Sequence, residues 1–513
     1  MNNTHTQKKT SDCLYLTSFD FPFVSDCQGE LTMPDYYPEI RRIVSVFADA
    51  LPDSRYISDE NLELSGTVAF TVLYIGDDGS LTSVPYEAEY SQSIPLRGNF
   101  DGSSEDIFTY CTAEGAVCRP LGPRTLSLKA KVKSRICAYK KEDCTLKIQT
   151  DSGTAPSTDV RRTLERLDGE IPTVKYSHFS TTGNLTGEKE TTSGAKPVFC
   201  RASVLIKDTS AGRDSVNVKG EVEVSCLALS GEGLYRTYVI RLPFEEHVSA
   251  EGAEPGDVTA AYGRVAYVNV SADSDGSNLS ADCEYDVDVH VARPLYVPVT
   301  RDIYSTIYNL EQTKDEKNTA SLICLKNASR SVSGEGKRKS KPTEGEHIIH
   351  CNARAQADRV ELREGTVTFS GSCEFCCVIA AGGDCITETF SVPVKLEFSA
   401  DGHRTTDDCI WKMHASPAGA ECRLEGEKIF GKCELYIFAE AVGETKCAPV
   451  TAICEKGADR QRPDNATICV VYPEKGKSLW DIAKEERFSI SECESINHVK
   501  REDLSDGTPL IVK

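Results

Sequence analysis

The sequence has no long hydrophobic run. No stretch of its 513 residues approaches the ~18 consecutive apolar residues that a membrane-spanning helix requires. The first nine residues, Met1–Lys9, are polar, and no hydrophobic segment typical of a signal peptide follows them. We therefore expect no transmembrane segment and a chain that stays in the compartment where it is made.

Basic residues are scarce relative to acidic ones. Lys and Arg number 58 against 79 Asp and Glu, which gives a net charge of −21. Nucleic acid and anionic membranes repel such a chain as a whole, so neither is expected as a general partner. The exception is a short basic run, Gly336–Lys341. This run is typical of a solvated loop, and contact with an anionic surface or a partner is the alternative.

Signatures of catalysis are also missing. The sequence contains no His-Glu-x-x-His, no Gly-x-Ser-x-Gly and no phosphate-binding Gly-x-x-x-x-Gly-Lys-Ser/Thr motif. Its nine histidines are scattered, and an isolated carboxylate pair carries no information among 79 acidic residues. We therefore expect a protein that is not an enzyme and that uses no cofactor.

The 22 cysteines, from Cys13 to Cys493, lack the regular spacing of a disulfide framework. In a reducing compartment they are predicted to be small buried hydrophobes, with later oxidative cross-linking as the alternative. One Cys-x-x-Cys motif joins Cys373 and Cys376, but zinc would need a second pair. The motif also lies in an alternating strand, where these two positions face opposite sides. No metal site is predicted.

The most informative feature that is present is an internal repeat. Three stretches alternate apolar and polar residues around Gly66, Gly220 and Gly371, at spacings of 154 and 151 residues. A period of two predicts antiparallel strands with one buried face. Each stretch is followed by a glycine-rich turn, and another alternating strand begins 58 to 60 residues after each glycine. Eighteen residues before each glycine lies an alanine: Ala48, Ala202 and Ala353.

This repeat predicts a mainly β fold with three related antiparallel modules of about 150 residues. The predicted modules are residues 13–145, 172–300 and 318–455. Only the first contains Pro38–Val44, which is predicted to be a short helix with proline at its first position. The polar segments Asp151–Asp168 and Glu311–Glu346 are predicted to link the modules.

The pattern changes in the last fifty residues, 465–513. A short apolar run, Thr467–Tyr472, predicts a strand, and Pro509–Val512 predicts another. Two pairs between them have the spacing of capping boxes, Ser478 with Asp481 and Ser489 with Glu492. These signals predict a small domain with the order strand, helix, helix, strand.

That order resembles a LysM domain. The residues that carry the resemblance are Gly476, Leu479–Ala483, Asn497, Gly507 and Leu510–Ile511. LysM domains that bind N-acetylglucosamine polymers usually have Gly-Asp-Thr-Leu in the first loop. Here Lys477 occupies the acidic position. The resemblance implies the βααβ fold, and Lys477 counts against binding of glycan.

A LysM domain behind three such β modules resembles the clostridial spore-coat morphogenetic proteins, which carry repeated SPOCS domains. Met33–Ile40 resembles the proline-containing entry of a SPOCS domain. The resemblance implies a non-enzymatic scaffold in the mother-cell cytoplasm at the forespore surface. Its LysM domain would dock onto the coat-basement ATPase of sporulation stage IV, and its β modules would contact other coat proteins during coat assembly and encasement. The alternatives are a peptidoglycan-binding cell-wall protein and a wall hydrolase.

The predicted binding surface lies on the LysM-like domain. Its first strand is apolar on both faces, and so small a domain buries one of them, which leaves the other for a partner. Trp480 is either a binding hot spot or a core residue, and Lys477 would meet an acidic partner. The predicted partner-binding residues are Ile468, Val470, Lys477, Ser478, Leu479, Trp480 and Asn497.

Overall fold

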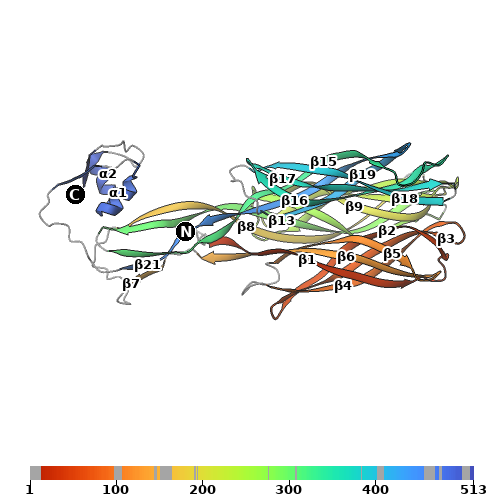
Figure 1. Ribbon diagram of the computed structural model, residues 1–513, viewed down its shortest axis with the longest axis horizontal. Coiled ribbons are helices and arrows are strands. Elements are labelled where there is room, and N and C mark those ends of the chain that lie inside the picture. Colours follow the sequence, from red (N-terminus) through yellow and green to blue (C-terminus); the bar gives the residue numbers. More distant parts are fainter. Residues whose placement is uncertain are drawn as a thin grey trace, which may run out of the picture.

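The computed structural model is mainly β and elongated, with a small helical unit at one end (Figure 1). The residues it describes are 13–96, 107–143, 147–150, 164–189, 192, 194–274, 277–306, 309–382, 384–400, 409–455, 468–472, 476–498 and 509–512. No helix among these residues is long and apolar enough to cross a membrane.

Three antiparallel sheets share one layout, in which the middle strand of the sequence is also the middle strand of the sheet. The first contains β2 (Ile40–Ser58), β3 (Asn61–Gly76) and β4 (Leu81–Pro95). The second contains β9 (Lys196–Ala211), β10 (Ser215–Leu229) and β11 (Tyr235–Ser249). The third contains β16 (His347–Arg363), β17 (Thr366–Ala381) and β18 (Asp384–Ser399). The three alternating stretches of the sequence are thus β3, β10 and β17, as predicted.

Each of these sheets faces a second layer whose strand order also recurs. The layers are β1 (Cys13–Thr32), β6 (Thr125–Asp143) and β5 (Ile107–Pro120); β8 (Leu164–Lys189), β13 (Leu279–Ser305) and β12 (Val258–Ala272); and β15 (Lys317–Lys337), β20 (Lys428–Cys447) and β19 (Cys409–Glu425). In each layer, the first strand pairs with the long closing strand. Because β1 also pairs with β15, the first and third layers join into one six-stranded sheet.

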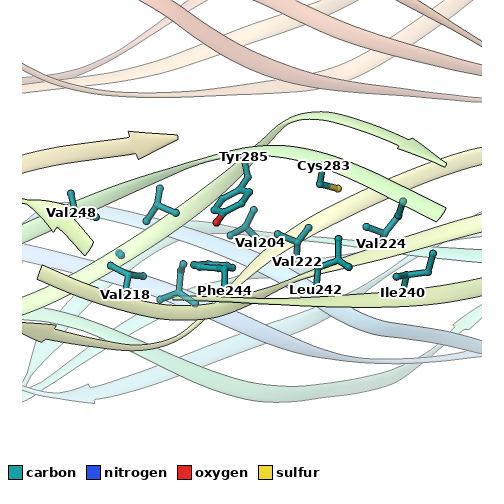
Figure 2. Packing of buried hydrophobic residues seen from close by; sticks show 14 of the residues in the cluster. Val204, Val218, Val222, Val224, Ile240, Leu242, Phe244, Val248, Cys283 and Tyr285 are labelled. Atoms are coloured by element: carbon teal, nitrogen blue, oxygen red, sulfur yellow. The ribbon is translucent and has the colours of Figure 1, made fainter. Parts of the chain in front are cut away.

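The hydrophobic core lies between the paired layers. Figure 2 shows this packing in the second pair, where Val218, Val222 and Val224 of β10 face the interior at alternate positions. Phe244 of β11 and Tyr285 of β13 meet across the interior with ring centroids 4.9 Å apart. The period-two pattern therefore reflects burial of one face of each sheet.

The repeated glycines have a structural reason. Beside each one, the preceding strand carries one extra residue, a β-bulge, so the two backbones approach closely. A Cβ on Gly66, Gly220 or Gly371 would lie 2.3, 2.5 or 2.0 Å from a backbone carbonyl oxygen of the neighbouring strand. The repeated alanines also occupy equivalent places, since Ala48 pairs with Phe70, Ala202 with Val224 and Ala353 with Phe375.

Short strands complete the architecture. β7 (Lys147–Thr150), β14 (Leu310–Lys314) and β21 (Val450–Glu455) form a separate sheet in the order β14, β21, β7. The C-terminal unit contains β22 (Cys469–Val471), α1 (Leu479–Glu486), α2 (Ile490–Asn497) and β23 (Leu510–Val512). In Figure 1, β8 and β13 extend together toward this unit.

Two sequence-based predictions about the β body are wrong. Pro38–Val44 is not a helix, because β2 begins at Ile40, and the β-branched residues Ile40 and Ile43 pair with β3. Glu311–Glu346 is not a linker, because most of it forms β14 and β15, and β15 lies between β20 and β1. Of Asp151–Asp168, residues 164–168 belong to β8, and 151–163 lie outside the described residues.

The basic run is also more than a solvated loop. Arg338 is buried, and its guanidinium pairs with both carboxylate oxygens of Glu346. The backbone amides of Lys339 and Ser340 donate to the carboxylate of Glu388, at 3.1 and 2.6 Å. The exposed Lys341 follows these contacts. The centre of the run therefore holds the chain in place after β15.

Candidate functional site

The C-terminal unit is built around two short helices. Before α1, the Ser478 hydroxyl accepts a hydrogen bond from the Asp481 amide at 3.2 Å, and the Asp481 carboxylate accepts one from the Ser478 amide at 3.0 Å. This is the predicted capping box. The second predicted box is wrong, because Ser489 precedes α2 without a side-chain cap. Its hydroxyl lies 2.9 Å from that of Ser491 instead.

A compact core holds the unit together. Buried residues come from both helices, the connection between them and β23. They are Leu479, Trp480, Ile482, Ala483, Phe488, Ile490, Cys493 and Leu510, and Val471 packs against them. Leu479 and Trp480 are thus interior residues in this structure.

Trp480 also attaches the unit to the rest of the chain. Its indole Nε1 donates to Asp302 of β13 at 2.9 Å, and its ring meets Tyr304 edge-on at 5.0 Å. Lys484 donates to the same carboxylate at 2.6 Å, and the Tyr304 hydroxyl donates to the Phe488 carbonyl at 2.9 Å. Partial burial raises the pKa of Asp302, but the hydrogen bonds from Lys484 and Trp480 outweigh it and bring this pKa below its ordinary value.

An apolar face lies on the β22–β23 ribbon. Val470 pairs with Ile511, and these side chains are 45% and 39% exposed. Ile468 and Tyr472 lie two residues to either side of Val470 and are 66% and 69% exposed. On the opposite face of the ribbon, Leu510 is fully buried and Val471 packs against the core, whereas Cys469 is exposed. We call Ile468, Val470, Tyr472 and Ile511 the apolar face.

The remaining predicted residues have roles within the unit. Lys477 forms an ion pair with Glu485 at 2.7 Å. The Asn497 side chain donates to the Ile511 carbonyl at 2.8 Å and accepts from the Ile511 amide at 2.7 Å, which ties α2 to β23. Ser478 caps α1.

Of the predicted binding residues, the structure therefore brings only Ile468 and Val470 together on an exposed surface. Sequence reasoning missed Ile511, although its position beside Leu510 in a short apolar strand was a usable signal. It also missed Asp302 and Tyr304, because nothing in the sequence links these residues to a helix 178 positions further on.

A second concave region lies among the edge strands of the β layers. A cavity of about 1910 Å³ is bordered by β2, β9 and β16 and by β5, β12 and β19, which are equivalent strands in the repeated layout. Near these strands, buried His290 and Glu440 form a 2.7 Å contact. Lys412, also buried and bordering the cavity, lies 3.7 Å from the same carboxylate.

No protein-family model, curated protein or solved structure matches the chain. The structure defines a mainly β protein of repetitive architecture with a small βααβ unit at its C-terminal end. Its function is inferred from the sequence resemblance and from the exposed surface of that unit.

Proposed function

We propose that this protein is a non-enzymatic scaffold of the spore coat, built from three related β modules and a C-terminal LysM domain. The recurring order of strands supports the three modules, and so does the bulge beside each of Gly66, Gly220 and Gly371. The second module would begin with β8 at Leu164 and end with β13 at Ser305. The βααβ order of the last unit supports the LysM assignment.

The LysM domain docks onto the coat-basement ATPase of sporulation stage IV through the apolar face. The observation that carries this proposal is the exposed pair Val470 and Ile511, flanked by Ile468 and Tyr472. Four apolar side chains on one side of so small a ribbon form a surface that association with a protein would remove from water. The protein would act in the mother-cell cytoplasm at the forespore surface, and its β modules would contact other coat proteins during assembly and encasement.

The alternative function, binding of peptidoglycan, requires a polar sugar site in the first loop. In that loop, Lys477 occupies the position that is acidic in glycan-binding LysM domains and pairs with Glu485 of the same unit, which counts against glycan binding. Affinity for insoluble peptidoglycan separates the two functions.

The experiment measures binding of the full-length chain to the purified ATPase. The full chain is needed because removing β13 would uncover Trp480 and create apolar surface that the protein does not have. We expect Val470→Asp to weaken binding at least about tenfold, since a buried unpaired charge opposes docking. Val117→Asp is the control, because Val117 is also 45% exposed but lies on β5.

Equal binding by the Val470→Asp variant and the unaltered chain would contradict the docking surface. Sedimentation of the full chain with peptidoglycan, without binding to the ATPase, would replace the scaffold with the glycan-binding alternative. Thermal melting of both variants establishes that a loss of binding does not come from unfolding.

A further inference from the structure

Three cysteines from two different layers meet inside the third group of strands. Cys351 of β16 and Cys377 of β17 are directly paired in their sheet. Cys422 belongs to β19 in the facing layer. The three sulfur atoms all lie within 4.8 Å of one another, and those of Cys351 and Cys422 are 3.0 Å apart.

The surroundings of these thiols differ from those of the neighbouring cysteines. Cys373 faces the same core as Cys377, and its sulfur lies 3.8 Å from that of Cys433. Cys376 lies on the opposite side of β17, as the alternation predicts. The spacing of 26 and 45 residues between the three clustered cysteines gave no signal in the sequence, since only the pairing of the strands brings them together.

The distances suit a shared metal ion. Zinc–sulfur bonds are about 2.3 Å long, so three thiolates around one ion lie roughly 3.8–4.0 Å apart. A disulfide needs about 2.05 Å and involves only two sulfurs. Small adjustments of side chains that are already adjacent would therefore place all three sulfurs around one ion.

Chemistry and access agree with the geometry. A thiolate is the form of cysteine that binds a metal, and a cation bound among three thiols favours that form. Cys351 also borders the 1910 Å³ cavity, which provides a path for an ion to enter. Soft thiolate ligands favour zinc and monovalent copper over magnesium or calcium.

We propose that Cys351, Cys377 and Cys422 form a three-thiolate site for a soft d10 cation, Zn²⁺ or Cu⁺. No fourth His, Cys or carboxylate joins the group among the residues that the structure describes. Copper(I) is satisfied by three thiolates, whereas zinc would take a water from the cavity as its fourth ligand. The ion would join the β16–β17 sheet to β19 of the facing layer. This structural role does not depend on whether the C-terminal unit binds the ATPase.

The test is metal binding by the full-length chain, reduced and kept free of oxygen. Separate samples are incubated with Zn²⁺ or with Cu⁺, desalted and analysed for metal content. We expect about one tightly held ion per chain from at least one of the two. Cys422→Ser should lower the affinity for that ion at least about tenfold, while Cys373→Ser, which removes a thiol of the neighbouring pair, should leave it unchanged.

Two further readouts keep the result interpretable. Binding should raise the melting temperature of the unaltered chain but not that of the Cys422→Ser variant. Co²⁺ bound in the same place should give the near-ultraviolet absorption of cobalt–thiolate bonds. If Cys377→Ser does not fold because Cys377 is fully buried, Cys351→Ser and Cys422→Ser still test the site at half-buried positions.

The proposal is overturned if the unaltered chain retains no more of either ion than the Cys422→Ser variant. It is equally overturned if Cys373→Ser abolishes binding as completely as Cys422→Ser does. A Cys351–Cys422 disulfide mapped in the metal-treated, reduced protein would also exclude it.

Discussion

The indole nitrogen of Trp480 donates a 2.9 Å hydrogen bond to the carboxylate of Asp302, near the end of β13. Asp302 also accepts from Lys484 and from Gln312, at 2.6 and 2.8 Å. One carboxylate therefore connects α1, β13 and β14. This arrangement directs the Trp480 side chain toward the protein's own body and leaves the ribbon of β22 and β23 as the exposed apolar surface of the C-terminal unit.

The first prediction concerns this attachment. Asp302→Ala removes the acceptor for three donors, and we expect it to weaken the attachment of the C-terminal unit to the β body by about 1–3 kcal/mol. In a Trp411→Phe background, Trp480 is the only tryptophan of the chain. Its fluorescence emission should shift to longer wavelength when Asp302→Ala is added, because the loosened unit exposes the indole to water. Asp282 is also on β13, and Asp282→Ala, which removes a surface hydrogen bond from Thr186 of β8, should leave the emission unchanged.

The same carboxylate predicts that the attachment of the C-terminal unit to the β body weakens at acid pH. Because the pKa of Asp302 is lowered in the folded protein, its contribution is present above the ordinary carboxyl pKa and is lost as pH falls through the lowered value. The attachment should thus be intact at pH 5 and weaken below about pH 4. Trp480 emission across this range measures the attachment, and an emission shift that begins near pH 6 would contradict the assignment to Asp302.

The repeated glycines give the next prediction. An added Cβ on Gly371 would lie 2.0 Å from the Gln356 carbonyl oxygen, which belongs to the backbone and cannot move aside easily. We expect Gly371→Ala to lower the free energy of unfolding by about 2–3 kcal/mol. Gly122→Ala is the control, since its Cβ would meet nothing within 4 Å. Equal melting temperatures for the two variants would refute the steric account.

These glycines illustrate what the sequence alone can predict. Alternation and spacing were enough to predict β3, β10 and β17 and a mainly β fold, because burial of one face imposes a period of two. The same pattern failed for β15, whose polar stretches resemble a linker. That strand is specified by its neighbours β20 and β1, and no local signal in the sequence reports such distant partners.

The candidate sites show the same limit. The alternation of Ile468 and Val470 was visible in the sequence, and so was the capping box of Ser478. The contact between Trp480 and Asp302 was not, because the fold alone brings these residues together. A hot-spot residue and a core residue look alike in a sequence, since both are large, apolar and placed on a short helix.

The basic run allows a test of a buried ion pair. The Arg338 side chain is 1% exposed and pairs with Glu346, whose side chain is 12% exposed, so Arg338→Gln would leave this carboxylate without its cation. We expect a loss of about 1–3 kcal/mol in the free energy of unfolding. Lys341→Gln, in the exposed part of the run, should change it by less than about 0.5 kcal/mol. Similar effects of the two changes would restore the solvated-loop interpretation.

The last prediction concerns the response of the β body to acid. His350 is buried, with its ring edge-on to Phe199 at 5.3 Å and its Nδ1 3.3 Å from the Thr237 hydroxyl. Burial lowers its pKa to about 4, so between pH 6.5 and 4 the unfolded chain binds a proton that the folded chain does not. The free energy of unfolding should therefore fall as the pH falls. This group alone should lower it by about 1 kcal/mol between pH 7.5 and pH 5.5.

His350→Gln should remove that part of the pH dependence, whereas substitution of the exposed His347 on the same strand should not. Unfolding by urea at the two pH values measures the difference, and an unchanged slope in the His350 variant would show that other groups titrate in its place.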